Sequence, residues 1–128
     1  MEFPGTIMEA LEIKIVEASA DRVVCTMPVS PKTRQPAGVL HGGASLVLAE
    51  TAASIGTHVQ IDQEQEIAVG MEINANHLRP VFDGIVTAVA VPLHKGRTSM
   101  VWDIRITDAN DRLICVSRCT VAIVKKNR

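Results

Sequence analysis

Aromatic side chains are almost missing from this chain of 128 residues. They make up 2% of it, as Phe3, Phe82 and Trp102, and there is no tyrosine. A core predicted from this composition is aliphatic, and the chain lacks the aromatic platforms on which single-stranded nucleic acids stack. The formal net charge of −1 also lacks the basic excess of a nucleic-acid-binding surface.

Long uncharged apolar runs are also absent: none approaches the ~18 residues of a membrane span. The first residues lack the basic and apolar regions of a signal peptide. Cys25, Cys115 and Cys119 have no metal or redox spacing, and an odd count fits a reducing compartment. We therefore expect a cytoplasmic protein without membrane or nucleic-acid partners. The three thiols fall in apolar strands, which argues against a cysteine nucleophile.

Signals for a second domain or a bound cofactor are lacking as well. The sequence contains no repeat, low-complexity segment or linker, and 47% hydrophobic residues predict one compact domain over residues 1–128. There is no phosphate-binding or dinucleotide-binding glycine pattern, so no cofactor is expected. The histidines lack metal-ligand spacing, so no metal is expected.

The hydrophobic periodicity predicts two strands, one long helix and four further strands. The predicted strands cover residues 11–17, 22–28, 66–80, 85–93, 97–107 and 113–124, and the predicted helix covers residues 42–60. Strands joined by turns favour an antiparallel sheet over parallel crossovers. The predicted class is α+β, one helix on a large antiparallel sheet. Small helix residues let that sheet curl closely around it: Ser45, Ala49, Ala52 and Gly56.

Strict alternation within residues 66–80 predicts an apolar and a polar face. The apolar face would carry Ile67, Val69, Met71, Ile73, Ala75 and His77, and the opposite face Ala68, Gly70, Glu72, Asn74 and Asn76. One helix covers only part of so wide a sheet. We therefore expect a homo-oligomer that covers the remaining face and edges.

The start of the predicted helix combines His41, Gly42 and Gly43 with Glu50 two turns later. A helix start presents unpaired N–H groups and the positive end of the helix dipole, and glycine allows another molecule to approach them. Glu50 is the one charge in an apolar run, and no lysine or arginine lies three or four residues away. This pattern favours an oxyanion site and a carboxylate able to do acid–base or nucleophilic work.

Each of these residues also has a purely structural interpretation. Glu50 fits a solvated helix surface, the glycines fit close packing, and His41 fits a helix cap. His77 fits a core or interface histidine, since it continues a strand's predicted apolar face. Spacing alone leaves both interpretations open.

Three segments make the chain recognisable: residues 35–50 (QPAGVLHGGASLVLAE), 69–77 (VGMEINANH) and 92–97 (PLHKGR). They resemble the signature of hotdog-fold acyl-CoA thioesterases, in which a sheet wraps around one central helix. The likeness is strongest to the subgroup of Glu-dependent 4-hydroxybenzoyl-CoA thioesterases and 1,4-dihydroxy-2-naphthoyl-CoA hydrolases of menaquinone biosynthesis.

The resemblance implies a role for each matching residue. Glu50 would be the catalytic carboxylate, as nucleophile or as general base, and the Gly42 N–H would hold the developing oxyanion. Gln35 and His41 would position the carbonyl, and Ser54 would hold water or the carboxylate. Further substrate-binding positions are His77 and Ile55 in the acyl pocket, Gly43 at the helix start, and Lys95, Gly96, Arg97 and Thr98 near the CoA phosphates.

The resemblance also implies a dimer or tetramer with its site between subunits, and CoA as part of the substrate. An aromatic acyl-CoA is the expected substrate, with 1,4-dihydroxy-2-naphthoyl-CoA leading, because relatives acting on phenylacetyl groups carry Asp where Glu50 stands. Two alternatives stay open. One is a hotdog β-hydroxyacyl-thioester dehydratase or hydratase, echoed in residues 36–40. The other is a non-catalytic acyl-CoA sensor, which the chain length disfavours.

Overall fold

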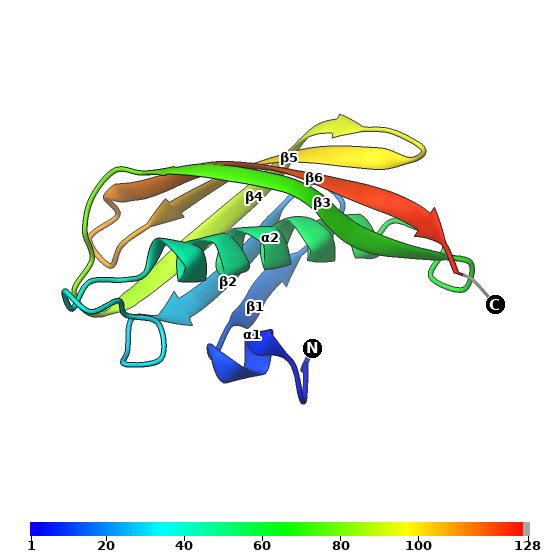
Figure 1. The fold of residues 1–128 in the computed structure, drawn as a ribbon. Helices are drawn as coiled ribbons and strands as arrows, with labels where there is room; N and C mark the ends of the chain where they lie inside the picture. The colour runs from blue at the N-terminus through cyan, green and yellow to red at the C-terminus, as the bar shows by residue number, and fades with distance from the viewer. Residues whose placement is uncertain (127–128) are drawn as a thin grey trace.

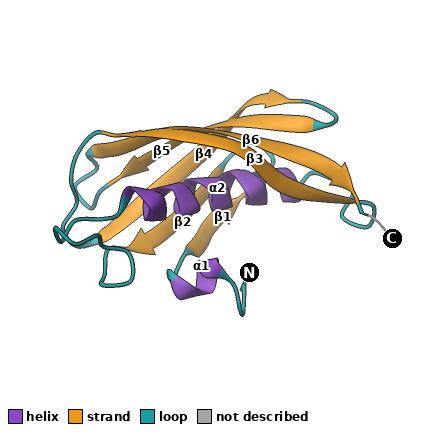
Figure 2. Cartoon of the chain, in the orientation of Figure 1, coloured by secondary structure: helices purple, strands orange, loops and turns teal. Residues whose placement is uncertain are grey.

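The chain folds into one six-stranded antiparallel sheet that wraps around a long helix, as the hotdog resemblance implies (Figures 1 and 2). The computed structural model describes residues 1–126. Its elements in chain order are α1 (Ile7–Ala10), β1 (Lys14–Ala18), β2 (Val23–Pro28), α2 (Gly42–His58), β3 (Glu66–His77), β4 (Ile85–Lys95), β5 (Ser99–Thr107) and β6 (Leu113–Lys125). The sheet order is β1-β2-β4-β5-β6-β3, so β1 and β3 form its edges.

Helix α2 lies close to the sheet because its sheet-facing residues are small. Ser45, Ala49, Ala52 and Gly56 are all buried, which confirms the predicted contact face. At Gly56 the ring of Trp102 fills the space that a side chain would take. The indole N–H of Trp102 donates to the Thr57 hydroxyl (3.0 Å), so this one buried aromatic is both packed and hydrogen-bonded.

Strand β3 corrects the predicted alternation. The pairing of β3 with β6 shifts register between Gly70 and Glu72, which is a β-bulge. Because a bulge adds one residue, it exchanges the two faces of the strand beyond it. Ala68 therefore packs on the core together with Ile73 and Ala75, whereas Ile67, Val69 and Met71 are exposed. The continuous apolar face predicted for this strand does not exist.

The remaining differences are small and lie at element ends. The one-turn helix α1 was not predicted, since four residues give no readable period. Helix α2 ends at His58 rather than residue 60, and β4 continues to Lys95, where a turn was expected. In the part of the chain that the structure describes, no helix is long and apolar enough to cross a membrane.

Candidate functional site

The first turn of α2 leaves one backbone donor unused. His41 is the N-cap, and its Nδ1 accepts a hydrogen bond from the Gly43 N–H (2.8 Å). The N–H groups of Ala44 and Ser45 both donate to the His41 carbonyl oxygen (3.0 and 3.3 Å). Among the described residues the Gly42 N–H has no partner, so it is the donor that this positively polarised helix end offers to a ligand.

The loop before α2 holds Gln35 in a defined place. The Gln35 backbone N–H donates to the Val39 carbonyl (2.9 Å), and the Gly38 N–H donates to the Gln35 carbonyl (2.8 Å). The side-chain oxygen of Gln35 accepts the Ala37 N–H. Because that oxygen is occupied within the loop, the amide NH₂ is the end left free to donate to a substrate.

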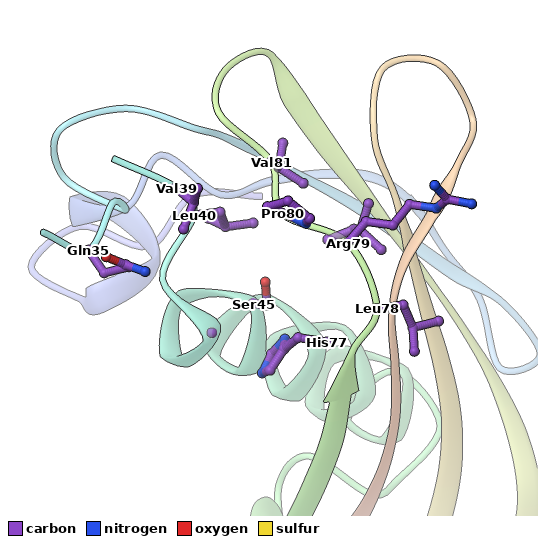
Figure 3. Close-up of a pocket in the computed structure, with 11 residues that line it drawn as sticks. Gln35, Val39, Leu40, Ser45, His77, Leu78, Arg79, Pro80 and Val81 are labelled. Carbon is purple, nitrogen blue, oxygen red and sulfur yellow. The ribbon is translucent and has the colours of Figure 1, made fainter. Parts of the chain in front are cut away.

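A cavity of about 290 Å³ lies beside this helix start (Figure 3). Its walls come from the loop, from α2, from the end of β3 with the segment that follows it, and from β6, and include Gln35, Leu40, Gly42, Ser45, His77 and Ile114. The His77 ring lies against Gly42: a Cβ atom built there would stand 2.6 Å from His77 Nε2. The structure thus brings three of the predicted site residues, Gln35, Gly42 and His77, to one cavity.

Glu50 lies half-buried further along α2, against strand β3. A Cβ atom built at Gly70 would collide with the carboxyl group of Glu50, so the carboxylate fills the space left by that missing side chain. Glu50 also lines a second cavity, of about 340 Å³. The other walls are Val47, Thr51, Ser54 and Ile55 of α2 and Ile7 and Met8 of α1.

One chain does not bring Gly42 and Glu50 together. They stand eight residues apart on the same helix, and a rise of ~1.5 Å per residue separates them by ~12 Å along its axis. A thioester carbonyl attacked at its carbon and held at its oxygen needs both groups within roughly 3–3.5 Å of the reacting atoms. Seven of the predicted site residues besides Glu50 therefore form two half-sites: Ser54 and Ile55 lie beside Glu50, and the helix start holds Gln35, His41, Gly42, Gly43 and His77.

The turn predicted to lie near the CoA phosphates, residues 95–98, is nearer to Glu50 than to the start of α2. The Thr98 carbonyl accepts the Ile123 N–H (2.9 Å), and Ile123 pairs with Ala68, two residues before Gly70. Gly96 has a structural role, since a Cβ there would stand 2.8 Å from the Ser99 carbonyl oxygen. Lys95 binds the Asp21 carboxylate (2.7 Å), whereas Arg97 is exposed.

The three cysteines are buried and their thiols are kept protonated. Burial raises the pKa of Cys25 to about 12. Burial, with the nearby Glu50 and Glu72 carboxylates, raises the pKa of Cys119 to about 12, and burial also raises that of Cys115. These thiols are therefore not nucleophiles at neutral pH. Over residues 1–126 no group of three or more His, Cys, Asp or Glu side chains is arranged to hold a metal ion.

Sequence reasoning missed three residues of this region. Gly70 was placed on the face opposite to that of Ile73 and Ala75, because the bulge after Gly70, which brings these residues onto one face, leaves no mark in the alternation. Ile7 and Met8 belong to the unpredicted α1. The sequence did contain a signal for that turn: Thr6 and Glu9 have the spacing of a capping box, and Glu9 accepts the Gly5 N–H (2.9 Å).

Comparisons with known proteins agree with this architecture. The family model of the thioesterase superfamily matches residues 37–115, which include Gly42, Glu50 and His77 and begin after Gln35. The protein ComA2 of Bacillus subtilis is 55% identical over 126 residues, covering 98% of this chain and 100% of that protein.

Two further relatives have a named activity. A 1,4-dihydroxy-2-naphthoyl-CoA hydrolase of Listeria monocytogenes is 47% identical, covering 95% of this chain and 98% of that protein. The crystal structure of the thioesterase HI1161 of Haemophilus influenzae superposes with a TM-score of 0.89 at 43% identity, covering 95% of this chain and 85% of that one.

Proposed function

This chain belongs to the thioesterase superfamily, and from that membership we propose that it hydrolyses an aromatic acyl-CoA to the free acid and CoA. The observation that carries the proposal is the placement of Glu50. It is the single carboxylate of α2, and it stands in the wall of a mainly apolar cavity. A carboxylate held there is ready to attack, or to activate water toward, a bound thioester carbonyl.

The start of α2 supplies the groups that such a carbonyl needs. As the carbonyl carbon is attacked, negative charge grows on its oxygen, and the unused Gly42 N–H is aimed to receive it. The free amide of Gln35 is a second donor. His41 accepts through Nδ1, so its Nε2 carries the remaining ring proton and is a third.

Glu50 has two chemically complete routes to the product. As a nucleophile, its carboxylate attacks the carbonyl carbon, CoA thiolate leaves, and water then hydrolyses the resulting anhydride. As a general base, it takes a proton from water, whose oxygen attacks while the thiolate leaves and is then protonated. Ser54 lines the same cavity one turn after Glu50 and is placed to hold that water.

The ~12 Å between Gly42 and Glu50 supports a site shared by two subunits. In a homodimer, the helix start of one chain would meet Glu50 of its partner, and twofold symmetry would create two such sites. The exposed edge strand β3, with Ile67, Val69 and Met71 on its outer side, is a surface that such an association would cover.

The naming of the Listeria relative supports 1,4-dihydroxy-2-naphthoyl-CoA as the leading substrate. We place the CoA phosphates near Arg97 and the Gly96–Thr98 backbone, because Lys95 is already paired with Asp21. The occupied Nδ1 of His41 favours hydrolysis over the dehydratase alternative, in which a loop histidine would need a free lone pair.

The test is thiol release from 1,4-dihydroxy-2-naphthoyl-CoA, benzoyl-CoA and a medium-chain fatty acyl-CoA, with Glu50→Ala assayed in parallel. We expect an aromatic preference, and a loss of kcat in the variant of about 10²–10⁴-fold, the usual contribution of such a group. Unchanged activity in Glu50→Ala would show that the chemistry lies elsewhere. A wild-type protein that hydrolyses none of the three thioesters would contradict the proposed function.

A further inference from the structure

The short helix α1 forms one wall of the cavity beside Glu50. In Figure 1, α1 lies on the side of α2 that the curled sheet leaves open. Ile7 and Met8 of α1 face Val47 and Ile55 of α2 across this space of about 340 Å³. Because ligand pockets span roughly 300–1,000 Å³ and CoA is a large molecule, a volume of this size fits the acyl end of a thioester.

Local hydrogen bonds and the packing of Met8 against the core hold α1 in this position. None of its four residues is buried. The Gly5 N–H donates to the Glu9 carboxylate (2.9 Å), and the Ile13 N–H donates to the Met8 carbonyl (2.9 Å). Phe3 and Leu11 pack on the core on either side of the turn. The α1 turn is therefore a preformed wall, in which Ile7 is exposed and the half-buried Met8 packs on the core while it also lines the cavity.

The cavity has polar side chains on its α2 wall and none on its α1 wall. Glu50, Thr51 and Ser54 lie together on α2, whereas the remaining lining residues are aliphatic side chains or Met8. Among the lining residues that the structure describes, Glu50 is the only ionisable one. A ligand that places its reacting carbonyl at Glu50 must therefore direct an uncharged, apolar body toward α1.

We infer that α1 is the outer wall of the acyl pocket, and that Met8, with Ile7, selects uncharged apolar acyl groups by size. This inference rests on the proposed function and adds a specificity role for a segment outside the catalytic residues. Methionine suits the role, since its flexible thioether adapts to ligands of different shape. A charged acyl group has no partner among these side chains and is excluded.

The test measures binding, so that it does not depend on turnover. The probes are phenacyl-CoA and 2-naphthacyl-CoA, ketones in which a methylene separates the carbonyl from sulfur and prevents hydrolysis. Their dissociation constants are measured by calorimetry for the wild type, Met8→Ala and Met8→Trp. Val16→Trp is the matched control, because Val16 is exposed on β1 and lines neither cavity.

We expect the two variants to move the preference in opposite directions. Met8→Trp fills the pocket and should weaken 2-naphthacyl-CoA about tenfold more than phenacyl-CoA, the lower range for a misfitting methylene. Met8→Ala enlarges the pocket and should shift the ratio of the two dissociation constants in favour of the larger probe. If Met8→Trp does not fold, Met8→Ala alone provides the test. Val16→Trp should leave the ratio unchanged.

An unchanged ratio in the Met8 variants, or no binding of either probe to the wild type, would overturn the inference. So would an altered oligomeric state in Met8→Ala with an unchanged ratio, since a second copy of the chain would then fill the cavity. The proposed function fails differently, through hydrolysis that survives Glu50→Ala or is missing in the wild type.

Discussion

At the scale of single residues, the position of the Glu50 carboxylate depends on the facing residue of β3, a glycine that has no side chain. Gly70 leaves the space that the carboxyl group fills. Glycine is entropically costly within a strand and often marks a close approach. Here the group that approaches is the proposed catalytic carboxylate, so Gly70 acts as a positioning residue.

Gly70→Ala should lower kcat by about 10²-fold, because a displacement near 1 Å from productive geometry costs that much. The new Cβ meets the flexible end of Glu50 rather than backbone, so the fold should persist. KM should change little, since the acyl pocket is intact. Steady-state kinetics with a thermal melt measure all three quantities.

The control for Gly70→Ala is the same change in a Glu50→Ala background. If Gly70 acts only through the carboxylate, the double variant should be no slower than Glu50→Ala alone. A further loss in the double variant, or wild-type kcat in the single one, would show that Gly70 has no positioning role.

At the scale of elements, the β5–β6 hairpin depends on one carboxylate in its turn. Asp108 accepts the N–H groups of Asn110 and Arg112 (each 2.9 Å) and the Arg112 side-chain Nε–H (2.9 Å). The hydrogen bond from the Arg112 backbone, followed by the other Asn110 and Arg112 contacts, holds the pKa of Asp108 below its ordinary value. β6 also carries Cys119, whose pKa the nearby Glu50 carboxylate helps to raise, so this turn helps to set the register of a strand near Glu50.

Asp108→Asn should lower the urea midpoint at neutral pH and have little effect in acid. A folded-state pKa below the unfolded value means that the stabilisation is present above the unfolded pKa and is lost as the pH falls through the folded pKa. Urea melts from pH 7 down to the acid transition measure this. Asp111→Asn removes the same charge from the same turn without these bonds, so its effect should be small at every pH. Equal effects of the two variants would contradict the assigned role.

At the scale of the whole molecule, the separated half-sites predict that function requires two chains. Gly42→Pro tests the helix-start half-site, because proline removes the N–H and is well tolerated at a first helical position. The extended backbone of His41 (φ −71°, ψ 132°) is also compatible with a following proline. Gly42→Ala is the matched control: it adds the same Cβ beside His77 but keeps the N–H.

Heterodimers of Gly42→Pro with Glu50→Ala should recover about half of the wild-type activity per dimer. If each site combines Gly42 of one chain with Glu50 of the other, one of the two sites in a heterodimer is intact. The two chains are coexpressed with different tags, purified through both, and assayed beside the two inactive homodimers. A heterodimer as inactive as its parents would place both groups in the same chain and refute the shared site. The heterodimer of Gly42→Ala with Glu50→Ala is the reference that measures the effect of the added Cβ beside His77.

The amino-acid sequence by itself determined the main elements and indicated the family. Helix α2, its small contact face and the following four strands were predictable, because turn residues and apolar period are local properties. The resemblance of residues 35–50 to hotdog thioesterases indicated the family that the comparisons then showed. The proposed roles of Glu50 and Gly42 rest on that resemblance and on their place on one helix.

Only the tertiary structure decided which of these residues meet. The bulge after Gly70 lets this residue and His77 beyond it both face α2, and a single extra residue in a ladder is invisible to a period-two pattern. The closure of the Glu50 cavity by α1 depends on contacts between segments some 40 residues apart, which no local signal records. The ~12 Å between Gly42 and Glu50 follows from helix geometry. That the two residues line two different cavities follows from the surrounding loops and strands. Local patterns fix backbone conformation, whereas the assembly of a site depends on packing between distant segments.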